Sequence, residues 1–324
     1  MNQTSQPCVS VILPILNEER DLENCISAIL QQDYSASIEV ILALGPSKDK
    51  TTQIAKALSA GDSRIKLVDN QYGQTAAGLN LAIKSSSHEI ICRIDGHSEI
   101  ESDYIKNAVS IMHQTGAVNV GGLMHANSEF GMQRTIAQAM GSKLGVGPSK
   151  FHTGGKAGAA DTVYLGVFKK SAIIAAGGFD ERYIRAQDWE LNHRMRKQGG
   201  LIWFDPRLVV TYRPRNSFPK LAKQYFQYGR WRRVIARQHP QTVNYRYLAP
   251  PIAVVITLMS VVSGLFINPI FIFPTLTYLT LILIGGFMVG KKLIDRLLMP
   301  FVLITMHFSW GVGFLTSPKK LFKN

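Results

Sequence analysis

Residues 89–97 read Glu-Ile-Ile-Cys-Arg-Ile-Asp-Gly-His, an apolar run that ends in a carboxylate and, two positions later, an imidazole. Such a run is typical of a buried parallel strand whose carboxyl end presents polar side chains at the edge of a sheet. Ligands bind at that edge in open α/β sheets. The stretch therefore predicts an α/β fold with a site directly after this strand.

Asp95 and His97 stand two positions apart, so their side chains point to the same side of an extended segment. One oxygen and one nitrogen ligand suit manganese or a similar ion better than calcium. We expect the two side chains to bind a divalent cation, Mn²⁺ or Mg²⁺, that masks the charge of a diphosphate. The alternative is an Asp-Gly turn followed by an unrelated histidine.

Strand and helix patterns alternate around this stretch. We expect strands at residues 9–13, 38–43, 65–68, 90–94 and 117–122, and helices at 22–29, from a cap at Ser47 to about 58, at 75–84 and at 103–113. This order predicts a mainly parallel sheet with helices on both faces. The right-handed crossover rule places the loops 14–18, 44–48, 70–74 and 95–99 on one edge.

The last quarter of the chain changes in composition. From about residue 247 it is almost continuously apolar, and segments 248–267 and 269–289 are long enough to cross a bilayer as helices. A third span, 297–315, is less apolar, and it would place Lys319, Lys320 and Lys323 outside, against the positive-inside rule. A re-entrant or interfacial segment is the alternative there. The uncharged turn near residue 268 is expected outside and the N-terminal part inside.

Charge adds a second signal before the apolar region. Residues 207–246 carry ten Lys or Arg, and no Asp or Glu occurs between Pro206 and Ile294. A nucleic acid is one partner for such a block, but the anionic cytoplasmic face of a membrane is better supported. We expect a catalytic domain at 1–215, a basic amphipathic interfacial segment at 216–246 and a membrane region of two to three spans at 247–324. A helix packed on the globular domain is the alternative for 217–239.

Two further segments carry weaker expectations. The glycine-rich residues 141–158 suggest a mobile loop, either a lid over a substrate or a plain connection. The cysteines Cys8, Cys25 and Cys92 lie far apart, which favours free thiols in a reducing compartment. The apolar run at 9–13 is too short for a signal-peptide core, so we expect no cleaved secretion signal.

A second group of polar residues lies at 185–194, Arg-Ala-Gln-Asp-Trp-Glu-Leu-Asn-His-Arg. Asp188 falls in the first turn of an expected helix, where the helix dipole favours a carboxylate, so a purely structural cap is one interpretation. Catalysis is the other. A sugar hydroxyl loses its proton only in the transition state, and a carboxylate that takes it supplies general-base help of about 10²–10⁴-fold.

Together these residues resemble glycosyltransferase family 2. Residues 9–19 are similar to the family's opening strand and P-x-x-N-E turn, and Asp95-Gly96-His97 falls at its D-x-D-type metal motif. Residues 177–181 match its G-G-F-D-E segment, Gln187-Asp188 its E-D motif, and residues 227–231 its Q-x-x-R-W motif. The resemblance covers about residues 8–235. With the apolar tail, it is strongest to membrane-anchored members of the succinoglycan-synthesis type that build exopolysaccharides.

The resemblance implies a GT-A-type nucleotide-sugar-binding domain followed by transmembrane helices, and an inverting transfer from a nucleoside diphosphate sugar. It implies that Asp188 is the catalytic base and that Asp95 and His97 hold the metal. The implied donor-binding residues are Pro14, Leu16, Glu18, Gly45, Asp95, Gln227, Arg230 and Trp231. The implied acceptor is lipid-linked or a growing saccharide, at the cytoplasmic face of the inner (plasma) membrane, with membrane lipids and no nucleic acid as partners.

The chain departs from the family pattern at three positions. Gly45 stands where an aspartate commonly binds the base, His97 replaces an acidic ligand, and Gln187 replaces a glutamate. These departures leave a membrane-tethered, non-catalytic binding protein as the alternative function. A dinucleotide oxidoreductase is disfavoured because the first turn has no G-x-G-x-x-G. Two or three membrane spans are few for a pore that conducts a polymer, so we expect addition of a single sugar.

Overall fold

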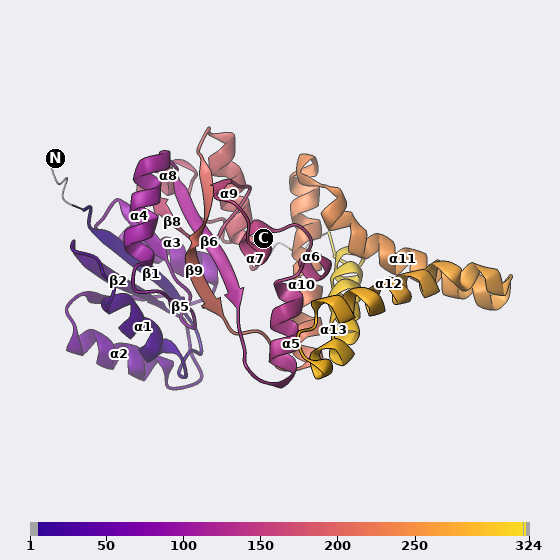
Figure 1. Ribbon diagram of the computed structural model, residues 1–324. Coiled ribbons are helices and arrows are strands. Elements are labelled where there is room, and N and C mark those ends of the chain that lie inside the picture. Colours follow the sequence, from indigo (N-terminus) through magenta and orange to yellow (C-terminus); the bar gives the residue numbers. More distant parts are fainter. Residues whose placement is uncertain (1–5, 320, 322–324) are drawn as a thin grey trace. The chain divides into compact units, whose positions relative to one another are not determined.

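The computed structural model describes residues 6–319 and 321. The chain divides into two compact units, residues 1–125 with 154–212 and residues 126–153 with 213–324. The sheet belongs to the first unit, whereas the second is built from helices (Figure 1). Lys320 and Lys323, which enter the predicted charge pattern, lie outside the described residues.

The first unit follows the predicted alternation of strands and helices. Its strands are β1 (Val9–Ile15), β2 (Ile38–Leu44), β3 (Ile65–Asp69), β4 (Ile90–Arg93), β5 (Glu99–Ile100), β6 (Asn119–Ala126), β7 (Gly158–Ala159), β8 (Tyr164–Lys169) and β9 (Ile202–Tyr212). Its helices are α1 (Leu22–Leu30), α2 (Thr51–Gly61), α3 (Thr75–Ser85), α4 (Tyr104–Thr115), α8 (Lys170–Ala175) and α9 (Gln187–Lys197).

Among the described residues, nine strands form one sheet in the order β3-β2-β1-β4-β8-β6-β9-β5, with β7 paired to β9. The strands β3, β2, β1 and β4 pair in parallel, and β8 joins β4 antiparallel. The predicted α/β fold is therefore confirmed, with a parallel first part and a mixed second part. The expected strand at 117–122 is β6, but β8, which comes later in the chain, lies between it and β4.

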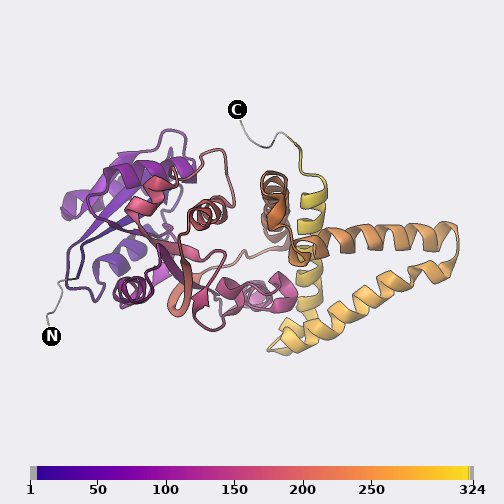
Figure 2. The ribbon, with the colours of Figure 1, turned by 90° about the horizontal axis from the view of Figure 1, so that it is seen from above.

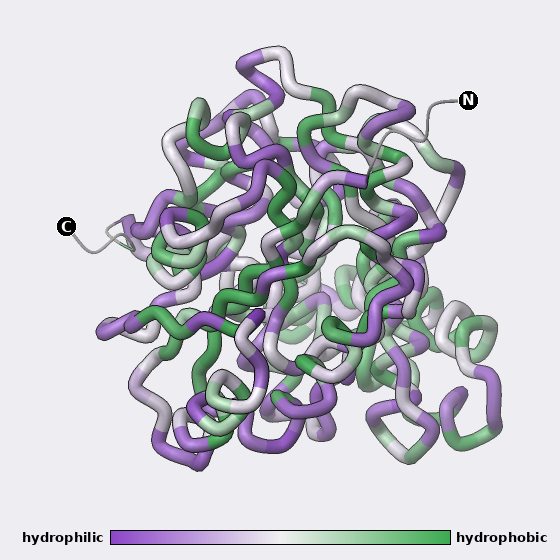
Figure 3. The backbone as a smooth tube through the Cα atoms, turned by 90° about the vertical axis from the view of Figure 1, so that its left-hand side faces the viewer, coloured by the Kyte–Doolittle hydropathy of each residue, from purple (hydrophilic) through white to green (hydrophobic). Residues whose placement is uncertain are grey.

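Both faces of the parallel part are covered, as predicted. On β1, Val9, Val11 and Leu13 are buried with the apolar face of α1 and α4 in one core cluster. Ile12 points to the opposite face and is also buried, and α3 packs there against β1 and β2. Figure 3 colours the backbone by hydropathy, and hydrophobic and hydrophilic stretches alternate along the chain. Burial on both faces explains why these strands are apolar throughout instead of alternating.

The second unit consists of the helices α5 (Gly131–Met140), α6 (Lys143–Val146), α7 (Lys150–Thr153), α10 (Phe218–Gln238), α11 (Tyr245–Phe266), α12 (Phe273–Val289) and α13 (Leu293–Leu315), with short 3₁₀ turns at Pro240–Thr242 and Pro269–Ile272. In the described part of the chain, three helical segments are long and apolar enough to cross a membrane, at 245–266, 269–289 and 293–315. Figure 2 shows α11 and α12 as a hairpin with α13 crossing its base.

The expected loop at the glycine-rich segment 141–158 is corrected in part, because the structure forms two short helices there and leaves the residues between and after them outside helices. It contains α6 and α7, and its last residue begins β7. A Cβ on Gly145 would lie 2.1 Å from the Ala139 carbonyl oxygen, so glycine permits a close backbone approach. The Leu144 carbonyl lies 2.8 Å from Nε2 of His307 in α13. Gly145 thus serves packing within the second unit.

Candidate active site

The turn after β4 brings the predicted metal residues against the first loop of the chain. An added Cβ on Gly96 would lie 2.7 Å from Cδ1 of Ile15 and 3.1 Å from Cγ of Glu18. Nδ1 of His97 lies 2.8 Å from Oε1 of Glu18. The predicted nucleoside-pocket residue Glu18 and the predicted metal residue His97 are therefore direct neighbours, and a larger residue at position 96 would displace the side chains of Ile15 and Glu18.

Arg93, the last residue of β4, joins the two predicted carboxylates. Its side chain is only 4% exposed, and its Nη2 donates to Oδ1 of Asp95 at 3.0 Å. Its Nη1 contacts Oδ1 of Asp188, which comes from α9 far along the chain. One guanidinium thus holds the predicted metal ligand and the predicted base together, as a planar fork of donors can. Sequence reasoning missed Arg93, although an arginine at the end of an apolar strand was the available signal.

The charges around Asp95 favour its ionised form. Burial by itself would raise the pKa of this carboxyl, but the positive charges of Arg93 and His97, and then that of Arg185, outweigh burial and hold the pKa below its usual value. Arg185 lies just before α9, and the sequence placed it in the polar group 185–194 without assigning it a role. Asp95 is therefore a carboxylate near neutral pH, as a metal ligand must be.

Hydrogen bonds tie the first loop to the loop after β2. The Asn17 amide donates to Oγ of Ser47 at 3.0 Å, and the Lys48 amide donates to Oδ1 of Asn17 at 2.8 Å. Asn17 needs a positive φ of 57° for this, a conformation that asparagine tolerates. The predicted helix cap at Ser47 is wrong, because α2 starts only at Thr51 and the Ser47 hydroxyl is used by the neighbouring loop.

The remaining predicted nucleoside residues lie at the carboxyl ends of β1 and β2. Pro14 is in the last part of β1, Leu16 directly follows it, and Gly45 directly follows β2. A Cβ on Gly45 would lie 3.0 Å from the Cα of Gly73 and 3.1 Å from Cδ1 of Leu16. The glycine that departs from the family pattern thus packs tightly on the adjacent loop, and its backbone is all that it offers a ligand.

Asp188 is presented by a strained turn at the start of α9. Ala186, directly before the helix, has a φ of 64°, and Asp188 and Glu190 lie in the first turn. An L-residue in this region costs roughly 1–2 kcal/mol, so surrounding contacts must hold it. The dipole of α9 favours the carboxylate at this end.

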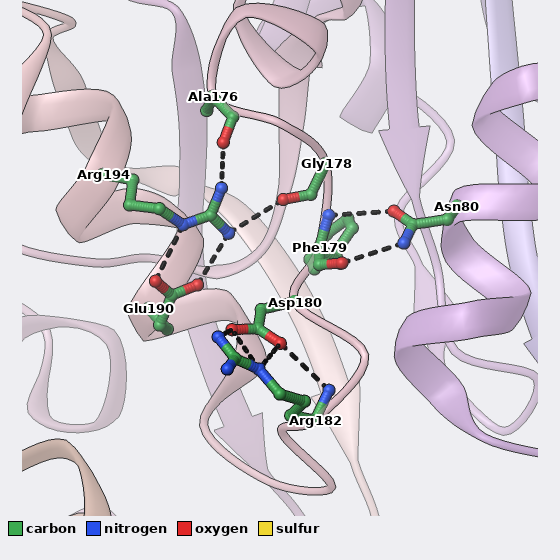
Figure 4. A network of polar contacts seen from close by, with 8 residues as sticks. All are labelled: Asn80, Ala176, Gly178, Phe179, Asp180, Arg182, Glu190 and Arg194. Atoms are coloured by element: carbon green, nitrogen blue, oxygen red, sulfur yellow. Dashed lines mark hydrogen bonds and ion pairs between the residues drawn. The ribbon is translucent and has the colours of Figure 1, made fainter. Parts of the chain in front are cut away.

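A polar network supports that turn (Figure 4). Arg194 of α9 binds Glu190 through two hydrogen bonds and donates to the carbonyls of Gly178 and Ala176. Asn80 of α3 binds both backbone groups of Phe179, each at 2.8 Å. The Gly177-Gly178 pair adopts positive φ values of 81° and 75° between these anchors. The predicted G-G-F-D-E segment therefore acts as a clamp that fixes α9 against α3.

Comparison with known proteins agrees with this geometry. A family model described as Glycosyl transferase family 2 matches residues 10–173, slightly more than half of the chain. The chain belongs to this family. It is therefore a glycosyltransferase, and the sequence-based assignment is confirmed.

Two curated relatives match most of this glycosyltransferase. It is 28% identical over 310 residues to the succinoglycan biosynthesis protein ExoA of Rhizobium meliloti, covering 94% of this chain and 93% of that protein. It is 27% identical over 272 residues to a dolichyl N-acetyl-alpha-D-glucosaminyl phosphate 3-beta-D-2,3-diacetamido-2,3-dideoxy-beta-D-glucuronosyltransferase of Methanococcus voltae, covering 80% and 83%.

A solved structure shares the fold. The mannosyltransferase PcManGT from Pyrobaculum calidifontis, solved with GDP-Man and Mn²⁺, superposes with a TM-score of 0.61 at 18% identity, covering 97% of this chain and 88% of that one. The likeness supports a GT-A-type fold, as the sequence predicted.

The metal ligands that this glycosyltransferase offers suit an ion whose remaining ligands would come from the substrate. Within residues 6–319 and 321, no three His, Cys, Asp or Glu side chains gather into a metal-binding cluster. Asp95 and His97 supply at most one carboxylate and one imidazole, whose Nδ1 faces Glu18, so Nε2 is the atom that would bind a metal. Ions such as Mg²⁺ commonly bind through one or two protein side chains together with substrate phosphates.

The Q-x-x-R-W residues lie on α10 in the second unit. Trp231 is buried, Gln227 and Arg230 are half-buried, and the Arg230 guanidinium lies 5.6 Å from the Phe226 ring centre. The Arg230 carbonyl accepts a hydrogen bond from Ser317 at 3.0 Å. Asp95, His97, Glu18 and Asp188 are brought together in the first unit, whereas a role for the α10 residues in the same reaction stays a prediction.

Proposed function

We propose that this glycosyltransferase moves one sugar, with inversion, from a nucleoside diphosphate sugar to a lipid-linked or growing saccharide in polysaccharide or glycan biosynthesis. The observation that carries the proposal is the shared contact of Asp95 and Asp188 with Arg93. The names of the relatives support the acceptor class, because one acts in succinoglycan biosynthesis and the other on a dolichyl-phosphate-linked sugar.

In this proposal Asp188 is the general base. Its carboxylate takes the proton of the acceptor hydroxyl while that oxygen forms a bond to the anomeric carbon. The bond from that carbon to the diphosphate breaks on the opposite face, the electron pair leaves with the diphosphate, and the configuration inverts. Arg93 contacts one carboxylate oxygen of Asp188, and in this proposal the other oxygen would face the acceptor. Such positioning is a large part of what a general base contributes.

Asp95 and His97 would hold a divalent cation, Mn²⁺ or Mg²⁺, against the donor diphosphate. When bound, that ion would neutralise charge on the departing diphosphate. Pro14, Leu16, Glu18 and Gly45 would line the nucleoside side of the donor. Gln227, Arg230 and Trp231 would serve the diphosphate and the acceptor end, a role that rests on the family resemblance alone.

The proposed location is the cytoplasmic face of the inner (plasma) membrane. The apolar segments 245–266 and 269–289 suit a bilayer by length and composition. Lys291, Lys292 and Arg296 follow the second of them, and the turn at Asn268 is uncharged. The positive-inside rule then favours an inward-facing catalytic unit.

The test measures donor binding and transfer separately. Full-length protein in detergent is screened by thermal shift with UDP-, GDP-, dTDP- and CDP-sugars and Mn²⁺, because a matched ligand raises the melting temperature. Asp188→Asn should keep the donor-induced shift but lose about 10²–10⁴-fold in turnover of that donor. The matched control is Asp161→Asn, whose side chain is 73% exposed. Full turnover by Asp188→Asn would refute the assigned base.

A further inference from the structure

Helix α13 differs from the other two apolar segments in how much of it is covered. In the second unit, 44% of its most apolar window is buried, against 17% for each of the segments 245–266 and 269–289. Along α11 and α12, large apolar side chains such as Leu258, Leu265, Leu281 and Met288 stay exposed. The hairpin thus presents a surface that suits lipid over most of its length, whereas α13 is covered by protein on one side and keeps Leu297 and Phe301 exposed on the other.

Helix α13 packs against α10, α11, α12 and α5, and among these α10 is a basic helix in direct backbone contact with it. A Cβ on Gly229 of α10 would lie 2.0 Å from the Trp310 carbonyl oxygen, and one on Gly313 of α13 would lie 2.1 Å from that of Phe226. Each helix therefore contributes a glycine where the two backbones meet, an arrangement known from close helix crossings. Wherever α13 lies in a membrane, α10 lies beside it.

The charges of α10 limit how deeply the pair of α10 and α13 can lie in a bilayer. Between residues 218 and 238 the helix carries Lys220, Lys223, Arg230, Arg232, Arg233 and Arg237 and no acidic residue. The Arg233 guanidinium lies 4.9 Å from the Phe314 ring centre, and Arg237 donates to the carbonyls of Ser317 and Pro318 at 2.7 and 2.8 Å. Each arginine at the centre of a bilayer costs at least about 2.5–3.5 kcal/mol, so this helix pair does not suit the hydrocarbon core.

The other end of α13 makes polar contacts as well, with α5. Asp295 is fully buried and accepts hydrogen bonds from Arg134, Thr135 and Gln138, all on α5, at 2.9–3.0 Å. Both ends of α13 are therefore held by polar contacts. Figures 1 and 2 agree that the α11–α12 hairpin points away from α13, which crosses its base.

We propose that α13 does not cross the membrane but lies with α10 in the headgroup layer, so that only α11 and α12 span. The inference rests on the proposed membrane location. It places Lys319 on the same side as Lys291, Lys292 and Arg296, which satisfies the positive-inside rule that a third span would break. The partner of the α10–α13 surface is an anionic lipid layer, which attracts basic residues.

The test compares the sides on which three points of the full-length chain lie. Reporter proteins that are active on only one side of the membrane are fused to the N-terminus and, separately, to the C-terminus. The turn is probed by Asn268→Cys in a Cys8→Ser background, because Cys25 and Cys92 are buried, with a thiol reagent that cannot cross the membrane. We expect both termini on one side and position 268 on the other.

The outcomes distinguish failure of the two-span arrangement from failure of the proposed cytoplasmic location. Termini on opposite sides would overturn the two-span arrangement. Labelling of position 268 from the same side as the termini would overturn it too, because the hairpin would then not cross. Both termini outside, with position 268 inside, would leave the inference standing and refute the cytoplasmic location. Recovery of the chain in the soluble fraction would refute membrane attachment and, with it, the inference.

Discussion

Replacing Arg93 by methionine tests whether one guanidinium holds the site together. Methionine keeps an unbranched side chain but removes the cation that Asp95 and Asp188 share. Two carboxylates would then lie close together with that partner gone. Removing one member of a buried ion pair leaves an uncompensated charge, which costs about 3–5 kcal/mol.

The exposure of the two carboxylates reduces that cost. The side chains of Asp95 and Asp188 are 23% and 28% exposed, so water screens part of the repulsion. We expect a loss of about 3 kcal/mol in the free energy of unfolding near pH 7, the low end of the range for a buried pair. For a folding unit of this size, that corresponds to a melting temperature lower by roughly 6–12 °C.

The deficit should depend on pH in a defined direction. In the native protein the pKa of Asp95 is lowered, so its contribution to stability is present above the pKa of the unfolded chain and is lost as pH falls through the folded value. In Arg93→Met, only the charges of His97 and Arg185 remain to oppose the effect of burial on Asp95. The pKa of Asp95 therefore rises. Protonation then relieves the repulsion, and the deficit should shrink as pH is lowered from 8 to 5.

The assay is a thermal melt of the full-length protein in detergent at several pH values. Arg182→Met is the control, because Arg182 pairs with Asp180 at the surface with 60% of its side chain exposed, and such pairs contribute about 1 kcal/mol or less. Adding Asp95→Asn to Arg93→Met should recover part of the loss. A melting temperature unchanged by Arg93→Met, or a deficit independent of pH, would refute the reasoning.

Three further outcomes follow from single residues. Burial would raise the pKa of Glu39, but hydrogen bonds, of which that from Lys66 is the strongest, lower it to about 2. About 3 kcal/mol of the free energy of unfolding should therefore be lost as the pH falls from about 4.5 to 2. In acid-unfolding curves, Glu39→Gln should show less of this loss. Gly96→Ala should reduce transfer and raise the donor Kd because its Cβ would meet the first loop, whereas Gly61→Ala, with nothing within 4 Å, should do neither. Ala186→Gly should increase the free energy of unfolding by roughly 1 kcal/mol or less, and so raise the melting temperature slightly, since glycine adopts a positive φ without strain. A melting temperature below that of the native protein would show that Ala186 is not strained.

Local periodicity was enough to predict most of the first unit. The apolar spacing of Leu22, Cys25, Ile26 and Ile29 predicted α1, and the same residues are buried in the structure. The crossover rule then grouped the loops that hold Glu18 and Asp95 on one edge. Such features could be predicted because neighbouring residues decide them.

Contacts between distant segments could not be predicted in this way. The pairing of Arg93 with Asp188 joins residues 95 positions apart, and nothing in the spacing of β4 specifies that partner. Glycine content suggested a loop at 141–158, but Gly145 is needed where α6 meets the carbonyl of Ala139. In both places the role of the residue depends on partners that come close to it only when the chain folds, so the neighbouring sequence does not reveal it.

The two roles of Arg93, charge and geometry, can be separated by Arg93→Lys. A cation beside a carboxylate in general opposes the uptake of a proton, which is what a general base must do. An arginine at this position helps catalysis only if the gain from orienting Asp188 is larger than this effect of its charge. Lysine keeps the charge but is a single point donor that cannot span two carboxylates as a planar fork does. We therefore expect Arg93→Lys to recover more than half of the stability lost in Arg93→Met while transfer stays about 10²-fold below the native rate, the effect of a small misplacement of a reacting group. A lysine variant that restored stability and transfer together would show that charge alone matters.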